Sequence, residues 1–159
     1  MRPTLYLETT IPSYLTARPS NDLAKAARQA ATRLWWDTRR GKYACFVSQL
    51  ILDEAARGDM DAARLRLEVL EGIPRLDLTD EALGLAKVLL SRKGLPAHAL
   101  EDALHIAVSA VHRMEYILTW NFRHIANART MKTIRRVCEE AGHPCPEICT
   151  PDQLLEGQR

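Results

Sequence analysis

The chain has 159 residues, of which 47% are hydrophobic and 26% charged, and its formal net charge at pH 7 is +2. This length suits one domain with its own core, and the composition is that of an ordinary globular protein. No apolar run reaches the length of a membrane span, and the amino-terminal residues lack the hydrophobic block of a secretion signal. We therefore expect one cytoplasmic domain over residues 1–159 that does not engage a membrane.

Short apolar segments alternate with longer helical segments along the chain. The predicted strands lie at 5–7, 43–48, 75–78, 116–119 and 147–149. The predicted helices lie at about 21–40, 49–57, 60–73, 80–92, 98–113 and 128–141. Ser48 and Thr79 are expected to cap the amino ends of their helices, and Gly41 suits the end of the first helix. Continuously apolar strands that alternate with helices predict a parallel sheet covered on both faces.

Several polar residues fall close to the carboxyl ends of the predicted strands. Glu8 follows the first strand and Asn121 follows the fourth, while Glu54 and Asp102 lie in helices near the same edge. In parallel α/β folds the reactive groups gather at this edge. Carboxylates that meet there repel one another unless a cation lies among them, and oxygen ligands favour Mg²⁺ or Mn²⁺. The pattern therefore predicts a divalent-metal site that could activate water for attack on phosphorus.

The predicted helix over 98–113 carries a narrow polar stripe on an otherwise apolar surface. Its members fall within an arc of about 80°, and they are His98, Asp102, His105, Ser109 and His112. The stripe could face a cleft that holds ions or phosphate, or it could face solvent or partners within the core. Histidines seven residues apart are separated by about 10 Å, too far for all three to ligate one ion. We therefore expect these histidines to be satisfied core or surface residues.

Three of the four cysteines, Cys138, Cys145 and Cys149, lie close to His143 near the end of the chain. Together they could supply four zinc ligands, but no closely spaced cysteine pair supports that interpretation. Reduced thiols are the default expectation for a cytosolic protein.

Four motifs in this order, with a fifth, closing segment, resemble a PIN domain, and the resemblance spans nearly the whole chain. They are YLETT at 6–10, ILDEAARGD at 51–59, EDALHIAVSAV at 101–111, ILTWN at 117–121 and ICTPDQLL at 148–155. The last motif looks like the closing strand and turn of VapC-like toxins, the ribonucleases of bacterial toxin–antitoxin pairs. The resemblance implies a three-layer α/β/α sandwich with a mostly parallel central sheet.

The resemblance also implies a metal-dependent endoribonuclease that uses Mg²⁺ or Mn²⁺. The catalytic positions of the family fall on Glu8, Glu54, Asp102 and Asn121, and its hydroxyl beside the first acid falls on Thr9, with Thr10 next to it. In this hypothesis Glu8 and Asp102 ligate the ion, Glu54 does so less directly, and Asn121 is an auxiliary ligand. Thr9 would orient a carboxylate or a water.

Two departures from the family pattern weaken the expected site. The family usually has Asp where this chain has Glu8, and often has acids where it has Asn121 and His124. We expect weaker metal binding as a result. The alternative function is therefore a catalytically weakened PIN-like module that binds RNA or a protein partner. A structure-specific DNA nuclease is a third interpretation, but 159 residues leave little room for the extra helices such enzymes use.

The RNA substrate would need cationic and aromatic contacts outside the acidic site. Arg129, Lys132 and Arg136 are spaced to share one helix face, which predicts a phosphate track, although a solvated face is the simpler interpretation. Trp120 could stack on a base, although burial is the more common state of a tryptophan at a strand end.

Two protein partners follow from the resemblance, a cognate antitoxin that blocks the pocket and a second copy of the chain in a homodimer. The only local support for the homodimer is the adjacent pair Trp35 and Trp36, which are expected to be exposed on an amphipathic helix. One of the two could equally be a core residue.

Overall fold

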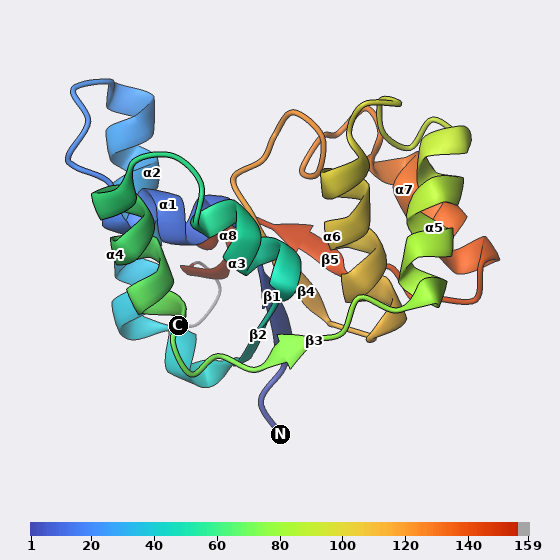
Figure 1. Ribbon diagram of the computed structural model, residues 1–159, viewed down its shortest axis with the longest axis horizontal. Helices are drawn as coiled ribbons and strands as arrows, with labels where there is room; N and C mark the ends of the chain where they lie inside the picture. The colour runs from blue at the N-terminus through green and yellow to red at the C-terminus, as the bar shows by residue number, and fades with distance from the viewer. Residues whose placement is uncertain (156–159) are drawn as a thin grey trace.

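Five parallel strands form the central sheet of the computed structural model, which describes residues 1–155 (Figure 1). They are β1 (Thr4–Leu7), β2 (Ala44–Ser48), β3 (Arg75–Leu76), β4 (Tyr116–Leu118) and β5 (Glu147–Cys149). The order across the sheet is β3-β2-β1-β4-β5, so β1 lies at the centre. Leu5, Tyr6 and Leu7 have no exposed surface, as expected for a strand that is covered on both faces.

Helices cover the two faces of this sheet. They are α1 (Thr10–Thr16), α2 (Leu23–Thr38), α3 (Gln49–Ala55), α4 (Met60–Leu70), α5 (Asp80–Ser91), α6 (Leu100–Val111), α7 (Met131–Glu140) and α8 (Pro151–Leu155). In Figure 1, α1, α2 and α4 lie to one side of the strands, and α5, α6 and α7 lie to the other. The predicted three-layer α/β/α architecture is confirmed, and the sheet is entirely parallel.

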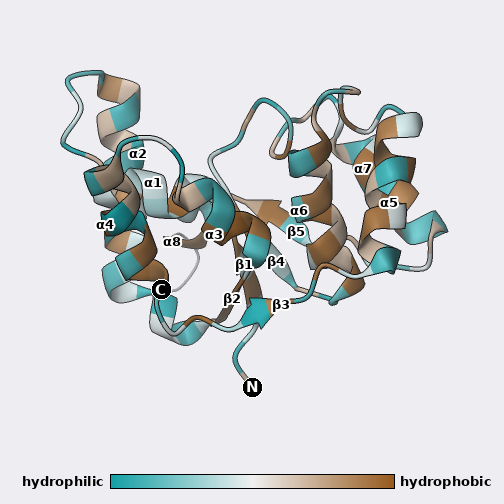
Figure 2. Ribbon diagram, viewed as in Figure 1, coloured by the Kyte–Doolittle hydropathy of each residue, from teal (hydrophilic) through white to brown (hydrophobic). Residues whose placement is uncertain are grey.

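The core follows the distribution of apolar residues. Figure 2 shows hydrophobic residues concentrated in β1, β2 and α6, whereas β3 at the edge of the sheet begins with the exposed Arg75. Eight successive residues of α6, from 103 to 110, are buried, which includes the polar His105 and Ser109. Within residues 1–155, no helix is both long enough and apolar enough to cross a membrane.

Most predicted boundaries lie within a few residues of the observed ones, with four notable differences. The helix α1 was not predicted, and a turn was expected where α8 lies. The helix α7 begins at Met131 rather than near residue 128, so Arg129 precedes it. Gly41 lies in a short 3₁₀ helix (η1, Arg40–Lys42) that follows α2.

The two predicted amino-terminal caps behave differently. The Thr79 side chain accepts a hydrogen bond from the Ala82 backbone amide at 3.1 Å and so caps α5 as predicted. Ser48 occupies the N-cap position of α3 but makes no capping hydrogen bond. Its hydroxyl is instead paired with the Tyr6 hydroxyl, so this polar group contributes to the interior of the site described next.

Candidate active site at the carboxyl edge of the sheet

Glu8 is a buried carboxylate directly after the central strand. Only 3% of the Glu8 surface is exposed. Its Oε1 accepts hydrogen bonds of 2.6 Å from the hydroxyls of Thr10 and Thr119. Burial raises the pKa of Glu8, and the charge of His105 and the hydrogen bonds from Thr10 and Thr119 only partly oppose that rise. A charge buried to this extent calls for positive charge beside it.

Glu54 reaches the same place from α3 and is held through both of its carboxylate oxygens. Thr9 donates a hydrogen bond of 3.0 Å to Oε2, and Oε1 is hydrogen-bonded to Nε2 of His105, which projects from α6. Two adjacent threonines thus donate hydrogen bonds to two different carboxylates, Thr9 to Glu54 and Thr10 to Glu8. The sequence TT after β1 therefore fixes the relative placement of the carboxylates.

A buried hydrogen-bonded chain lies behind His105. Its Nδ1 is 2.8 Å from the Tyr6 hydroxyl, which is 2.8 Å from the Ser48 hydroxyl. Because a carboxylate only accepts, Nε2 carries the proton that is shared with Glu54. In the neutral imidazole, Nδ1 then accepts from Tyr6. Burial lowers the pKa of His105, but the hydrogen bond to Glu54 and the charges of Glu54, Glu8 and Asp102 outweigh it, so that the net shift is upward.

Glu8, Glu54 and His105 converge, with one ligand atom of each lying within 4.8 Å of the others. Within residues 1–155, no other group of His, Cys, Asp and Glu side chains meets that condition. Carboxylate oxygens are ligands that both Mg²⁺ and Mn²⁺ accept. The donor set therefore fits a divalent cation, with Glu8 and Glu54 as the oxygen ligands and His105 holding Glu54 in place.

Asp102 does not belong to this group, although it lies one turn of α6 before His105. Its Oδ1 accepts from the Asn121 side-chain amide at 3.1 Å, and its Oδ2 is 2.7 Å from Nδ1 of His124. The side-chain oxygen of Asn121 in turn accepts a hydrogen bond of 3.0 Å from the His124 backbone amide. Asp102 and Asn121 thus contact each other, and Asp102 lies outside the cluster that contains Glu8.

The polar stripe expected on a helix over 98–113 is divided among different environments. His98 precedes α6, and its ring lies edge-on to that of His124 with the ring centroids 5.5 Å apart. His112 follows the helix, and its Nε2 is 2.8 Å from the Asp77 carbonyl oxygen. The expectation of satisfied histidines describes His112 well. It also describes His105, which is buried with both ring nitrogens hydrogen-bonded, but it did not predict that His105 lies at the convergence of the acids.

The predicted zinc alternative finds no support in the carboxyl-terminal segment. His143 pairs with Glu81 of α5 at 3.0 Å, and the four cysteines are free thiols. Within residues 1–155, the cysteines do not join a cluster of metal ligands.

The residues predicted to contact RNA have unequal access to solvent. Arg129, Lys132 and Arg136 are exposed, but only the last two belong to α7, so the three do not form one continuous helix face. Trp120 is 7% exposed, and its Nε1 donates a hydrogen bond of 2.7 Å to Thr32. The stacking role predicted for Trp120 is therefore wrong for this conformation, because the residue is buried.

The tryptophan pair expected to be exposed on α2 is not a free apolar surface. Trp35 has no exposed surface and belongs to the core. The ring of Trp36 is half-buried and lies under the guanidinium of Arg40, whose Cζ is 4.4 Å from the ring centroid. The homodimer therefore loses its only local support.

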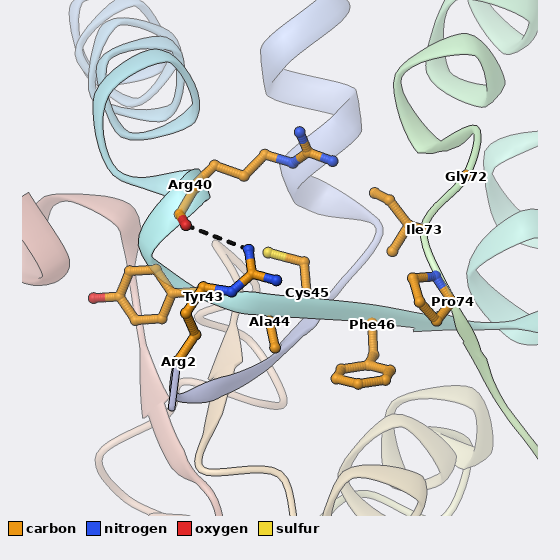
Figure 3. Close-up of a pocket in the computed structure, with 10 residues that line it drawn as sticks. Arg2, Arg40, Tyr43, Ala44, Cys45, Phe46, Gly72, Ile73 and Pro74 are labelled. Atoms are coloured by element: carbon orange, nitrogen blue, oxygen red, sulfur yellow. Dashed lines mark hydrogen bonds between the residues drawn. The ribbon is translucent and has the colours of Figure 1, made fainter.

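A basic pocket of about 350 Å³ lies at the opposite, amino-terminal edge of the sheet. Figure 3 shows Arg2 and Arg40 at this pocket together with Cys45 of β2, and Arg2 donates to the Gly41 carbonyl oxygen. Arg2 precedes β1 and Cys45 lies near the start of β2, whereas Glu8 follows the end of β1. This pocket therefore does not serve the acidic site.

Sequence reasoning missed four residues that shape the site, namely Tyr6, Ser48, His105 and Thr119. Tyr6 was assigned only to an apolar strand, and Ser48 only to a helix cap. A signal existed for the other two. His105 lies on the same stripe as Asp102, and Thr119 ends a strand beside Asn121.

Comparisons with known proteins give no relative for this chain. A scan against models of protein families finds no match, and a search of curated proteins finds none either. The resemblance to PIN domains therefore depends on the order of the motifs and on a fold that agrees with it.

Proposed function

We propose that this chain is a PIN-type, metal-dependent endoribonuclease that hydrolyses RNA phosphodiester bonds. The observation that supports this most is the convergence of Glu8, Glu54 and His105 at the carboxyl edge of a parallel sheet. Glu8 and Glu54 would hold Mg²⁺ or Mn²⁺, and Asp102 would add negative charge close by. When bound, such an ion supplies the acidity and the positive charge that phosphodiester hydrolysis needs.

The protein groups around the ion have separate tasks in this proposal. Thr10 and Thr119 orient Glu8, and Thr9 and His105 orient Glu54, so that both carboxylates are fixed before a substrate arrives. Such preorganisation lowers the reorganisation needed in the transition state. Asn121 holds Asp102 rather than the ion.

The resemblance to VapC-like toxins extends the proposal to the biological role. The chain would act in the cytoplasm as the toxin of a toxin–antitoxin pair, and a cognate antitoxin protein would silence the acidic site. A homodimer belongs to the same part of the proposal.

Cleavage of a labelled RNA pool by the purified protein tests the proposed activity. We expect cutting with Mn²⁺ or Mg²⁺ and none in EDTA, and we expect Glu54→Gln and Asp102→Asn each to abolish it while circular dichroism shows intact folding. The matched control is Glu68→Gln, which removes an exposed carboxylate of α4 that pairs with Arg64. Full activity of Glu54→Gln, or cutting in EDTA, would refute the proposal.

A second candidate function, a PIN-like module that binds RNA or a protein without cleaving, is favoured by one specific observation. Both oxygens of Asp102 are already engaged, one by Asn121 and the other by His124. Asp102, which the resemblance implies as a metal ligand, is therefore stabilised by protein groups and lies outside the cluster of Glu8, Glu54 and His105. Calorimetric titration with Mn²⁺ separates the two functions, because a folded protein that neither binds Mn²⁺ nor cuts RNA would be the binding module.

A further inference from the structure

A cationic and aromatic surface lies beside the acidic site. Phe122, in the loop after β4, is 44% exposed although its ring is large and apolar. The guanidinium carbon of Arg28, on α2, is 5.0 Å from the centroid of that ring. Arg28 also donates a hydrogen bond of 3.3 Å to the hydroxyl of Tyr14, on α1. Three separate elements thus bring two aromatic rings and one cation together at the surface.

This surface is connected to Glu8 through a short series of contacts. The rings of Tyr14 and Phe122 lie 6.1 and 6.0 Å from that of the buried Trp120. The backbone amide of Trp120 donates to Thr10 at 2.8 Å, and Thr10 donates to Glu8 at 2.6 Å. The buried tryptophan therefore packs against the half-buried Tyr14 and the exposed Phe122 and links both rings to the acid.

The surface continues into a pocket of about 350 Å³ between α1 and the amino end of α2. Its lining includes Tyr14 and two exposed cations, Arg18 and Lys25, and contains no acidic residue. The Gln29 side chain links the wall of this pocket, because it accepts a hydrogen bond from the Ser20 backbone amide at 3.0 Å and donates one to the Arg18 carbonyl oxygen at 2.9 Å. Positive charge thus extends from Arg28, beside the aromatic rings, to Arg18 and Lys25 in this pocket.

We propose that Tyr14, Arg18, Lys25, Arg28 and Phe122, here named the α1–α2 track, bind single-stranded RNA next to the acidic site. This inference rests on the proposed ribonuclease function and specifies its substrate as unpaired RNA. Unpaired bases offer their faces to Phe122 and to the Arg28 guanidinium, whereas a duplex keeps its base faces stacked inside. Arg18, Lys25 and Arg28 supply positive charge for the phosphates.

The test measures RNA binding in EDTA by fluorescence anisotropy, with a labelled single strand of about ten nucleotides and the duplex of the same sequence. We expect the single strand to bind at least tenfold more tightly than the duplex. Phe122→Leu, which keeps an apolar side chain but removes the ring, should weaken binding about tenfold. Phe122→Trp should preserve it, which separates stacking from a general loss of apolar surface.

Charge variants compare the α1–α2 track with the basic residues of α7. Arg28→Gln should weaken binding and reduce the salt dependence by the equivalent of about one phosphate contact. The matched controls Lys132→Gln and Arg136→Gln remove exposed cations from α7 and should have smaller effects. Circular dichroism of each variant checks folding.

Equal affinity for single strand and duplex would overturn the inference, and so would full binding by Phe122→Leu and Arg28→Gln. Loss of binding in the α7 variants alone would assign the RNA to α7 instead. Binding in EDTA does not require cleavage. A protein that binds RNA through the α1–α2 track but never cuts it would therefore refute the proposed nuclease activity and leave the proposed binding surface standing.

Discussion

A carboxylate as buried as Glu8 lowers the stability of a protein unless a positive charge lies beside it. At 3% exposure, Glu8 has the partial help of His105 and of two hydroxyls, yet its pKa remains above the ordinary 4.5. A raised carboxyl pKa means that the folded protein holds the proton more tightly than the unfolded chain does. The contribution of Glu8 to stability is therefore most favourable below about pH 4.5 and falls as the pH rises through the raised pKa.

Glu8→Gln should consequently stabilise the metal-free protein at neutral pH. The Gln carbonyl can still accept from Thr10 and Thr119, while the buried charge is gone. We expect the melting temperature in EDTA to rise by about 2–4 °C, equivalent to about 1 kcal/mol, and the difference from the wild type to vanish below pH 4.5. Mn²⁺ should raise the melting temperature of the wild type only. A variant less stable than the wild type in EDTA at pH 7 would contradict this account.

The chain from Ser48 through Tyr6 to His105 should behave as one cooperative unit. Tyr6→Phe removes the hydroxyl between two buried partners and should lower the free energy of unfolding by about 1–3 kcal/mol. Ser48→Ala should cost less in the Tyr6→Phe background than in the wild type, with a coupling energy of at least about 0.5 kcal/mol. Urea denaturation of the four proteins of this cycle measures the coupling, and additive effects would show that the two hydroxyls act independently.

Among the elements, α5 contains one glycine that the fold does not require, Gly84, and is followed closely by one that it does require, Gly94. At Gly94, just beyond α5, an added Cβ would lie 3.2 Å from the Leu89 carbonyl oxygen and 3.4 Å from the Ile134 side chain of α7. At Gly84, within α5, an added Cβ would meet nothing within 4 Å. Gly94 therefore allows the close approach of the two helices, whereas Gly84 only lowers helix propensity.

Alanine substitutions at these two positions should act in opposite directions. Gly84→Ala should stabilise the protein by about 0.5–1 kcal/mol, because alanine favours the helix. Gly94→Ala should destabilise it by about 1–3 kcal/mol through overpacking against backbone. Guanidinium denaturation of both variants tests the contrast, which would be contradicted by shifts of the same sign.

The sequence patterns best predicted the elements that consist mostly of apolar residues. The strand at 5–7 and the helix that carries Asp102 were found because burial on both faces leaves continuous apolar residues. The helix α1 was missed because it has only seven residues and contains Pro12, which a helix tolerates only in its first turn. The strand β3 has only two residues, which is too short for an alternation of apolar and polar residues to define its boundaries.

For the molecule as a whole, the sequence predicted the edge of the sheet where polar groups gather but not their partners. Glu8 and Glu54 were placed together because they follow adjacent parallel strands. His105 escaped notice because the spacing argument excluded three histidines around one ion and said nothing about one histidine against Glu54. Such pairings depend on how α3 and α6 approach each other, which local sequence does not encode.

The homodimer expected from the family resemblance stays a prediction, and Trp36 should not contribute to it. The Arg40 guanidinium covers the Trp36 ring, and Trp35 is internal. Sedimentation equilibrium over a concentration series should give the same association for the wild type and for Trp36→Ala. If Trp36→Ala alone lost association while remaining folded, α2 would be the interface after all.

The two outermost strands are very short, with two residues in β3 and three in β5. Each leaves few backbone amide and carbonyl groups to which a foreign strand could hydrogen-bond, which is a common protection against edge-to-edge aggregation. A continuous sheet across two copies of this chain is therefore disfavoured. Self-assembly would more readily use helices or loops, so it could be strengthened or abolished by surface substitutions that leave the sheet untouched.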